Sequence, residues 1–431
     1  MKLALTGSQV LLWRAAQKAA GVATAIVVMQ GLGPEGNGRY SLTVTIITVL
    51  GAVLSAGVGL ASVPRLRDGE ESPRRILRAQ GAWLLVVAGV LVILALLTRD
   101  SAPWGWLEGS LGWHPGLLAA VPLAVLGLVA YETANYDLLA AGRVVVGTVT
   151  ASGRALLLLA AMVLLLLVWS HGIVAAVLAL VGAHALAGLV LGRRAWVTVT
   201  TRLPADGRAR TPLPRLAGRL VRHGWLGQLS ALIYLLLLRL DQFLLESSLD
   251  VRAVGLYAAA AWAAELLWLV PEALNPLLVH SSSNQADRHR DRTAARAVRL
   301  GLGLTALAAI PLAVVCEPLL ALVRDGEFQA AAAPLRVLLP GIVAFAPGVI
   351  LAGDFIGRGR PAWNTHASAV TVVVNVALCL LWIPRFGIMG AAWASTVAYT
   401  LGAAIMMVRF QRLTGTRWAD LLVPRPSDLR R

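Results

Sequence analysis

The stretch LGPEGNGRYSL, residues 32–42, is a short polar interruption between two long apolar runs. Apolar runs of about 20 residues, the length that a helix needs to cross a bilayer, recur along the whole 431-residue chain. One globular core could not bury them all, and only 14% of the residues are charged. The sequence therefore predicts an all-α polytopic membrane protein. Its first apolar run, residues 8–30, is too long and too polar for a signal peptide. It is interpreted as a membrane helix that is not cleaved off.

Twelve membrane-spanning helices are predicted from the apolar runs and the breaks between them. Their ranges are 8–30, 38–63, 77–98, 116–139, 145–169, 172–192, 223–246, 252–279, 297–322, 334–356, 362–384 and 387–409. Cys316 and Cys379 both fall inside these apolar segments. They are interpreted as packing residues, because neither their spacing nor their neighbours indicate a disulfide or a metal site.

The basic residues predict the orientation of these helices. If the N-terminus is cytoplasmic, the inner segments hold 28 of the 38 Lys and Arg residues, and the outer loops hold five. Cytoplasmic loops of membrane proteins carry the basic excess, so both termini are predicted to be cytoplasmic. Topology thereby explains the net charge of +16, and nucleic acid is not expected as a partner.

Part of the stretch at residues 32–42 is repeated in the second half of the chain. GRY at residues 38–40 recurs as GLY at 255–257, and YDLLAAGR at 136–143 recurs as GDFIGRGR at 353–360, both at an offset of 217. Two further matches, VP at 121–122 with LP at 339–340 and HGIVAAVLA at 171–179 with FGIMGAAWA at 386–394, have offsets of 218 and 215. Four matches in order at nearly one offset predict two tandem six-helix repeats, and the even number of helices gives both repeats the same orientation.

The predicted organisation follows from this repeat. An N-terminal six-helix lobe at residues 1–192 precedes a basic cytoplasmic linker at 193–222, a C-terminal six-helix lobe at 223–410 and a cytoplasmic tail at 411–431. Transporters built from two parallel repeats bind substrate near the middle of the membrane and alternate access by rocking one repeat against the other.

The motifs themselves resemble those of a known family. LGPEGNGRYSL resembles the LG-x-x-G-x-G-x-Y segment of the Wzx-type polysaccharide-biosynthesis flippases, members of the multidrug/oligosaccharidyl-lipid/polysaccharide superfamily. RLDQFLLESSLDVRAVGLYAAA at residues 239–260 is similar to the family's R-x-D followed by V-G-x-Y-x-x-A, and FGIMGAAWAST at 386–396 to its G-x-x-G-A-A-x-A-T/S ending. Twelve helices disfavour the lipid II flippase subgroup, whose members typically have fourteen.

The resemblance implies a MATE-like fold and a transport function without enzyme activity or a cofactor. The implied cargo is an undecaprenyl-diphosphate-linked oligosaccharide, flipped from the inner to the outer leaflet of the bacterial cell membrane by alternating access. The implied partners are this cargo, membrane lipids and polysaccharide-assembly proteins. An ion-coupled multidrug antiporter of the same superfamily stays open as an alternative. A membrane glycosyltransferase or polymerase is disfavoured, because no outer loop holds clustered acids or a nucleophile.

Charged residues at bilayer depth are candidates for function, because they are costly unless they face protein or water. Arg14 and Lys18 lie one turn apart on the first predicted helix, on a face shared with Gln17 and Gly21. Two cations on one stripe suit the diphosphate of the cargo. The alternative is that both side chains extend to the inner headgroups.

The repeat draws attention to Arg154. A polar stripe on the helix predicted at 362–384 consists of Asn364, Ser368, Thr371 and Asn375. Subtracting 217 from Thr371 gives Arg154, which is therefore expected to face the cavity and to contact the diphosphate. The alternative is a structural ion pair with Glu132 or Asp137.

Two glutamates form the acidic counterpart in the second half. Glu265 and Glu272 are seven residues apart and so share one helix face. Subtracting 217 gives Thr48 and Ser55, which with Thr45 form a polar stripe on the second predicted helix. We hypothesise that the cations hold the diphosphate while the glutamates bind a coupling ion, H⁺ or Na⁺. The alternative is that both glutamates pair with cavity water or backbone.

The remaining intramembrane charges are given structural or gating roles. Arg239 and Asp241 lie on opposite sides of the helix predicted at 223–246, near its outer end, and are interpreted as interfacial anchors. Asp137 and Asp354 each precede an arginine by six residues, Arg143 and Arg360 respectively, and are interpreted as gating or helix-tying pairs at the cytoplasmic mouth. His184 is isolated in an apolar helix and is interpreted as a packing residue.

Overall fold

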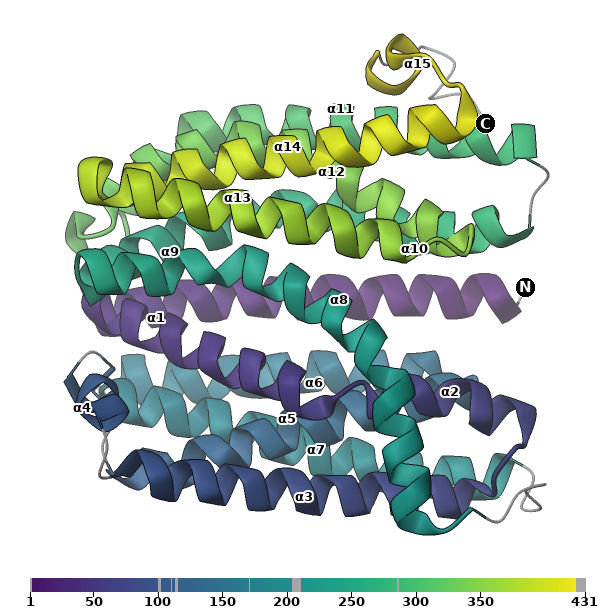
Figure 1. Cartoon of the computed structure of the whole chain (residues 1–431). Helices are drawn as coiled ribbons and strands as arrows, with labels where there is room; N and C mark the ends of the chain where they lie inside the picture. Colours follow the sequence, from purple (N-terminus) through teal and green to yellow (C-terminus); the bar gives the residue numbers. More distant parts are fainter. Residues whose placement is uncertain are drawn as a thin grey trace. The chain divides into compact units, whose positions relative to one another are not determined.

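The computed structural model describes residues 2–99, 102–109, 111–112, 115–169, 171–203, 211–284 and 287–423. Over these residues the chain forms helices and no β-strand. It divides into two compact units, Met1–Leu232 and Ile233–Arg431. The boundary falls within a single long helix, α8 (Leu213–Ser248) (Figure 1).

Unit 1 is an antiparallel bundle of long helices (Figure 1). In chain order its elements are α1 (Lys2–Ser55), α2 (Val58–Asp68), α3 (Pro73–Arg99), α4 (Ala102–Gly109), α5 (Pro115–Ala140), α6 (Val144–Met162), a π-helical continuation η1 (Val163–Val168), α7 (Ile173–Arg202) and the first part of α8. Helices α5 and α7 pack along each other, and α1 packs against α6.

Unit 2 contains the rest of α8 and the C-terminal helices. These are α9 (Val251–Glu265), η2 (Leu266–Trp268), α10 (Leu269–Asn284), α11 (Asp287–Ala321), η3 (Arg324–Gly326), η4 (Gln329–Ala331), α12 (Ala332–Gly357), α13 (Ala362–Phe386), α14 (Ile388–Thr414) and α15 (Trp418–Leu422). Helix α14 packs between α12 and α13. Both cysteines are buried and free, which confirms their interpretation as packing residues.

The helices have the length and composition of membrane spans. Ten stretches of the described residues are long and apolar enough to cross a membrane. The first of these, Leu12–Ser55, reverses direction at Gly33 and so covers two predicted spans. Helix α5, with 26 residues, covers another. The predicted spans therefore fall on helices, although the one at 38–63 is broken between α1 and α2 at residues 56–57. The prediction of an all-α multi-pass membrane protein is confirmed.

The reversal at Gly33 is tighter than predicted. The first two predicted spans leave a gap at residues 31–37, but the helix is interrupted only at Gly33, with φ 69° and ψ −178°. This region of backbone space is essentially restricted to glycine. Pro34 follows as the first residue of the returning arm, where its missing N–H leaves no hydrogen bond unmade. The glycine and the proline thus replace a loop.

Several helices extend well beyond the apolar runs that predicted them. Helix α7 continues to Arg202 and α8 begins at Leu213, so the described part of the predicted linker at 193–222 is largely helical. Helix α11 likewise begins at Asp287, ten residues before its predicted span. Hydropathy marks where a helix leaves the apolar layer, whereas arginine-rich helices can continue beyond it because Arg is a good helix former.

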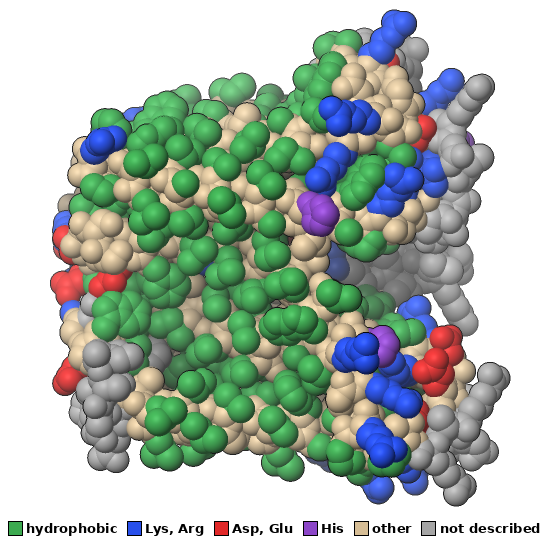
Figure 2. Space-filling view, viewed as in Figure 1, with side chains coloured by type: hydrophobic (Ala, Val, Ile, Leu, Met, Phe, Trp, Pro, Cys, Tyr) green, Lys and Arg blue, Asp and Glu red, His purple; other side chains and the backbone are tan. Residues whose placement is uncertain are grey.

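The charges follow the same arrangement within each unit. Figure 2 shows Lys and Arg side chains gathered where α14 ends in unit 2, and around α2 and the start of α8 in unit 1. The surface between the helix ends is predominantly hydrophobic on this face. A broad apolar band with basic residues at one end is typical of a membrane protein. That these basic ends face the cytoplasm stays a prediction.

Candidate functional site

The first arm of α1 presents the two predicted diphosphate cations on an exposed face. Arg14 and Lys18 are both exposed, and Gln17 is half-buried. At Gly21, one turn further along, an added Cβ would meet no atom within 4 Å. The same turn of α1 is held against α6, because the Ser152 hydroxyl donates a 2.6 Å hydrogen bond to the Trp13 carbonyl. Two cations thus project from a helix whose other side is packed.

Arg154 is directed elsewhere. Its Nη1 lies 2.8 Å from Nε2 of His184, and its guanidinium lies 5.4 Å from the centre of the Tyr131 ring. Side chains two residues apart on a helix point in nearly opposite directions, so Arg154 lies on the side of α6 away from the Ser152 contact with α1. Neither predicted ion pair, with Glu132 or with Asp137, is formed. His184 is not an isolated packing residue, as the sequence had indicated, but a partner of Arg154.

A close helix crossing fixes His184. An added Cβ on Gly127 of α5 would collide with the backbone of His184, and one on Gly188 of α7 would collide with the backbone of Gly127. The two backbones are therefore in direct contact. His184 is also anchored through Nδ1, which lies 2.8 Å from the Leu180 carbonyl oxygen. The Arg154–His184 contact is thus built into the packing of α5, α6 and α7.

Asp137 ties three helices of unit 1 together. It lies on α5, three residues before the helix ends, and is 2% exposed. Ser62 of α2 donates to its Oδ1 over 3.0 Å, and Gln80 of α3 donates to the same oxygen over 2.8 Å. The predicted partner Arg143 is exposed and does not contact it. The helix-tying role holds, but the pair with Arg143 was wrong.

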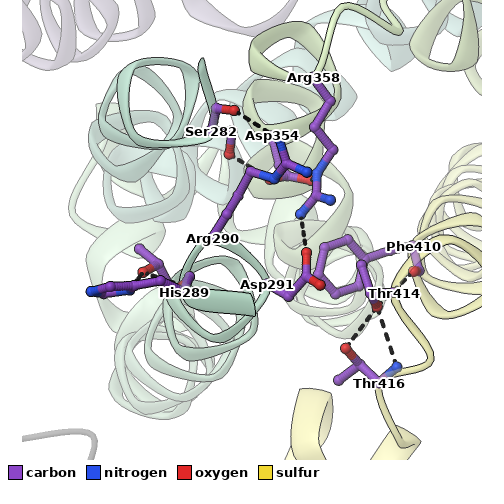
Figure 3. A network of polar contacts seen from close by, with 10 residues as sticks. Ser282, His289, Arg290, Asp291, Asp354, Arg358, Phe410, Thr414 and Thr416 are labelled. Atoms are coloured by element: carbon purple, nitrogen blue, oxygen red, sulfur yellow. Dashed lines mark hydrogen bonds and ion pairs between the residues drawn. The ribbon is translucent and has the colours of Figure 1, made fainter. Parts of the chain in front are cut away.

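Asp354 makes the equivalent tie in unit 2 (Figure 3). It lies on α12, again three residues before the helix ends. Ser282 of α10 and Arg358 donate to its two oxygens over 2.5 Å each. Arg358 also donates to Asp291 of α11 over 2.7 Å. The predicted partner Arg360 is exposed and lies instead 4.8 Å from the centre of the Trp363 ring.

The carboxylate of Glu265 forms an ion pair with the side chain of Arg239. Nη1 and Nη2 of Arg239 donate to the two carboxylate oxygens of Glu265 over 2.8 and 3.0 Å. Both side chains are largely buried, with 19% and 23% exposed. Arg239 is therefore paired inside unit 2 and is not an interfacial anchor, and Glu265 does not pair with backbone. Glu272 is exposed on α10.

The helix is interrupted directly after Glu265. Helix α9 ends there, and a single 3₁₀ turn, η2, precedes α10. Pro271 lacks the N–H that would bond to the carbonyl of Leu267, and its ring crowds that carbonyl. The Arg239–Glu265 pair therefore lies at a break in the helix.

Asp241 belongs to a buried polar cluster. Tyr257 of α9 donates to its Oδ2, as does Ser395 of α14 over 3.3 Å. Asn375 of α13 in turn donates to the Ser395 hydroxyl over 3.2 Å. Asp241 is 1% exposed, so it too is a packing partner of three helices rather than an anchor at the interface.

The residues of the predicted polar stripes hydrogen-bond mainly to helix backbone. On α13, Asn364 donates to the Ala352 carbonyl of α12 over 3.0 Å, Thr371 is buried and donates to its own helix, and Ser368 is half-buried. On α1 the hydroxyls follow the same pattern. Thr45 is buried, Thr48 donates to the Val44 carbonyl over 2.9 Å, and Ser55 donates to the Ala52 carbonyl over 3.1 Å. Their hydrogen bonds are thus made to helix backbone, and a place along the substrate cavity stays a prediction.

One family profile matches the chain. Residues 10–282 match the profile described as polysaccharide biosynthesis protein. The chain belongs to this family. The match covers more than half of the chain and includes Arg14 and Lys18, the Arg154–His184 contact and the Arg239–Glu265 pair. No curated protein sequence matches the chain.

Solved structures share the fold of this polysaccharide biosynthesis protein. The lipid II flippase MurJ in an inward closed conformation has a TM-score of 0.72 and 13% identity, over 93% of this chain and 87% of that one. An inward-facing multidrug resistance MATE family transporter has a TM-score of 0.69 and 15% identity, over 93% and 96%. A mutant of a MATE transporter from Vibrio cholerae has a TM-score of 0.62 and 15% identity, over 97% and 99%. The predicted MATE-like fold is thereby confirmed.

Sequence reasoning missed several partners in this polysaccharide biosynthesis protein. Arg358 could have been found, because it lies four residues after Asp354 and so on the same helix face. Ser62 and Ser282 are offset by 220 residues and therefore do not align at 217. His184 and Tyr257 carry no local signal, since their roles depend on which helices pack together.

Proposed function

We propose that the chain flips an undecaprenyl-diphosphate-linked oligosaccharide from the inner to the outer leaflet of the bacterial cell membrane by alternating access. Membership of the polysaccharide biosynthesis family and the fold shared with flippases and transporters support this proposal. The cargo has an anionic diphosphate, a hydroxyl-rich glycan and a long apolar tail. A protein that moves it must offer cationic donors at membrane depth without closing the path of the tail.

The observation that carries the proposal is the exposed cation pair on α1. Arg14 and Lys18 stand one turn apart on a helix that is otherwise long and apolar enough to span the membrane. A charge inside the bilayer costs several kcal/mol unless it faces water or an anion. A diphosphate suits both cations: the guanidinium can donate two parallel hydrogen bonds, and the ammonium acts as a compact charge.

We propose that the acidic site in unit 2 couples this movement to an ion, H⁺ or Na⁺. Because Glu265 is held by Arg239, a coupling ion has to compete with a guanidinium. Binding of the ion would then separate α8 from the break after α9. Glu272, an exposed residue directly after Pro271, is the second carboxylate in this proposal.

In this proposal the cargo crosses the membrane without any covalent bond being made or broken. Membrane lipids and polysaccharide-assembly proteins are the remaining proposed partners. A cation-exporting multidrug antiporter is the rival function, since MATE transporters share the fold. Arg14 and Lys18 argue against it, because they would repel a cationic drug.

The test is complementation of a strain that lacks the gene. We expect the wild-type chain to restore surface polysaccharide and the R14A/K18A variant to restore none, although it reaches the membrane. R194A is the matched control, since Arg194 is an exposed arginine near the end of α7, and we expect it to restore normal polysaccharide. Normal polysaccharide with R14A/K18A would refute the assignment. Export of ethidium without any effect on polysaccharide would establish the antiporter instead.

A further inference from the structure

Unit 1 holds a buried imidazole in contact with a permanently charged guanidinium. His184 is 6% exposed, and its Nε2 lies 2.8 Å from Nη1 of Arg154. We propose that His184 is a proton-binding site, and that the proton it binds releases Arg154 to hold an anionic diphosphate. This inference rests on the proposed function, because it takes the anion to be the diphosphate of the lipid-linked cargo.

The contacts of the imidazole determine where its proton lies. Nδ1 is 2.8 Å from the Leu180 carbonyl oxygen, which can only accept a hydrogen bond. Nδ1 therefore carries a hydrogen. Nε2 faces Nη1 of Arg154, which can only donate. Nε2 therefore offers its lone pair, and His184 is a neutral imidazole whose two nitrogens are both in use.

A proton on Nε2 is incompatible with this contact. It would place two N–H donors head to head at 2.8 Å and two positive charges at the same distance. The backbone contact between Gly127 and His184 leaves the histidine little freedom to move away. The Arg154 side chain is long and only half-buried, so it is the partner that moves. Protonation of His184 and its contact with Arg154 thus exclude each other.

Arg154 has unused capacity for an anion. Within the described residues its hydrogen-bond acceptor is His184, and its buried Nε has no acceptor. The titratable groups that interact electrostatically with Arg154 are Tyr40 on α1 and Tyr131 and Glu132 on α5. Glu132 forms no ion pair with it, so no carboxylate of the described residues contacts the guanidinium. A diphosphate would supply the missing negative charge.

The expected cycle couples one proton to one cargo molecule. In the empty protein, neutral His184 holds Arg154. When the diphosphate arrives, Arg154 turns to it, Nε2 of His184 takes a proton from water, and the imidazolium adds positive charge beside the anion. When the diphosphate leaves, the imidazolium loses that proton and Arg154 returns. This proton is bound in unit 1 and requires no ion at Glu265.

Proton uptake can be counted by calorimetry. The purified full chain in nanodiscs of phosphatidylethanolamine and phosphatidylglycerol is titrated at pH 7 with farnesyl diphosphate, in buffers of low and high ionisation enthalpy. We expect the wild type to take up about one proton more per diphosphate than H184Q, in which the amide oxygen can still accept from Arg154 but cannot titrate. H171Q is the matched control, because His171 is exposed, and it should behave as the wild type. Equal uptake by the wild type and H184Q would overturn the inference.

A second measurement does not depend on the cargo. Nitrogen-15 spectra of histidine-labelled protein report the tautomer, and the His184 signal is assigned by its loss in H184Q or H184N. We expect hydrogen on Nδ1 and a bare Nε2 at pH 7.5. Hydrogen on Nε2 at that pH would contradict the inference whatever the cargo. If farnesyl diphosphate does not bind the wild type while the expected tautomer is found, the proposed function fails and the proton site stands.

Discussion

Arg239 and Glu265 are joined by two hydrogen bonds of 2.8 and 3.0 Å, which link α8 to the residue at which α9 ends. The two bonds are nearly parallel, the arrangement in which guanidinium and carboxylate interact most strongly. Because both groups are largely buried, each charge is stable in its place only while the other charge is present. Glu265 thus has a defined partner, Arg239, which neither its sequence position nor its spacing had indicated.

The pair predicts a strong energetic coupling between the two residues. R239Q and E265Q should each lower the free energy of unfolding in detergent by about 3–5 kcal/mol, because each leaves a buried charge unpaired. R239Q/E265Q should lose less than the sum of the two by about 1–3 kcal/mol. E272Q is the control, since Glu272 is exposed, and it should stay near the wild type. Strict additivity of the two single losses would show that the pair does not couple.

A second prediction concerns the tie at Asp354. D354N leaves the Arg358 guanidinium with Asp291 alone and replaces a fully buried acceptor of two hydrogen bonds. We expect a loss of about 2–4 kcal/mol in the free energy of unfolding. R360Q should lose at most about 1 kcal/mol, because Arg360 is exposed and gives up only its contact with Trp363. Equal losses in the two variants would instead support the Asp354–Arg360 pair that was predicted from the sequence.

A third prediction concerns the reversal in α1. G33A should lower the free energy of unfolding by about 1–3 kcal/mol, because φ 69° with ψ −178° is strained for any residue with a Cβ. G21A lies in the same helix with open space around its Cβ position. It should be neutral or stabilising by up to about 1 kcal/mol. Thermal unfolding of the two variants in the same detergent checks the contrast, and an unaffected G33A would show that the turn tolerates a side chain.

The fold was largely accessible from the sequence, because the bilayer leaves a strong compositional signal. The apolar runs fell on helices, and the 217-residue repeat is reflected in contacts: Asp137 and Asp354 each accept from a serine on an earlier helix of their unit. The helix ends and the turn at Gly33 were not accessible. Apolar runs do not show how far a helix continues into water, and a glycine in a polar stretch does not show that it alone forms the turn.

The site was accessible only in part. The positions of Arg14, Lys18, Arg154 and Glu265 could be read from their charge in apolar surroundings, but their partners could not. Arg154 and His184 are 30 residues apart, and Arg239 and Glu265 are 26 apart. Pairing over such distances depends on which helix faces meet. Thr371, the counterpart of Arg154 at the offset of 217, donates to its own helix and lies against Gly402 of α14, so the repeat did not indicate the partner of Arg154.

We propose that Arg14 and Lys18 hold the diphosphate while the cargo crosses the membrane. The decisive assay uses proteoliposomes that contain a fluorescent undecaprenyl-diphosphate oligosaccharide and follows how fast an impermeant quencher or glycan-trimming enzyme gains access to it. We predict transfer between leaflets with the wild type and with R194A, and a loss of at least about 100-fold with R14A/K18A, corresponding to about 2.7 kcal/mol. Each protein should show the same melting temperature, because both cations are exposed. Transfer at the wild-type rate by R14A/K18A would contradict the account.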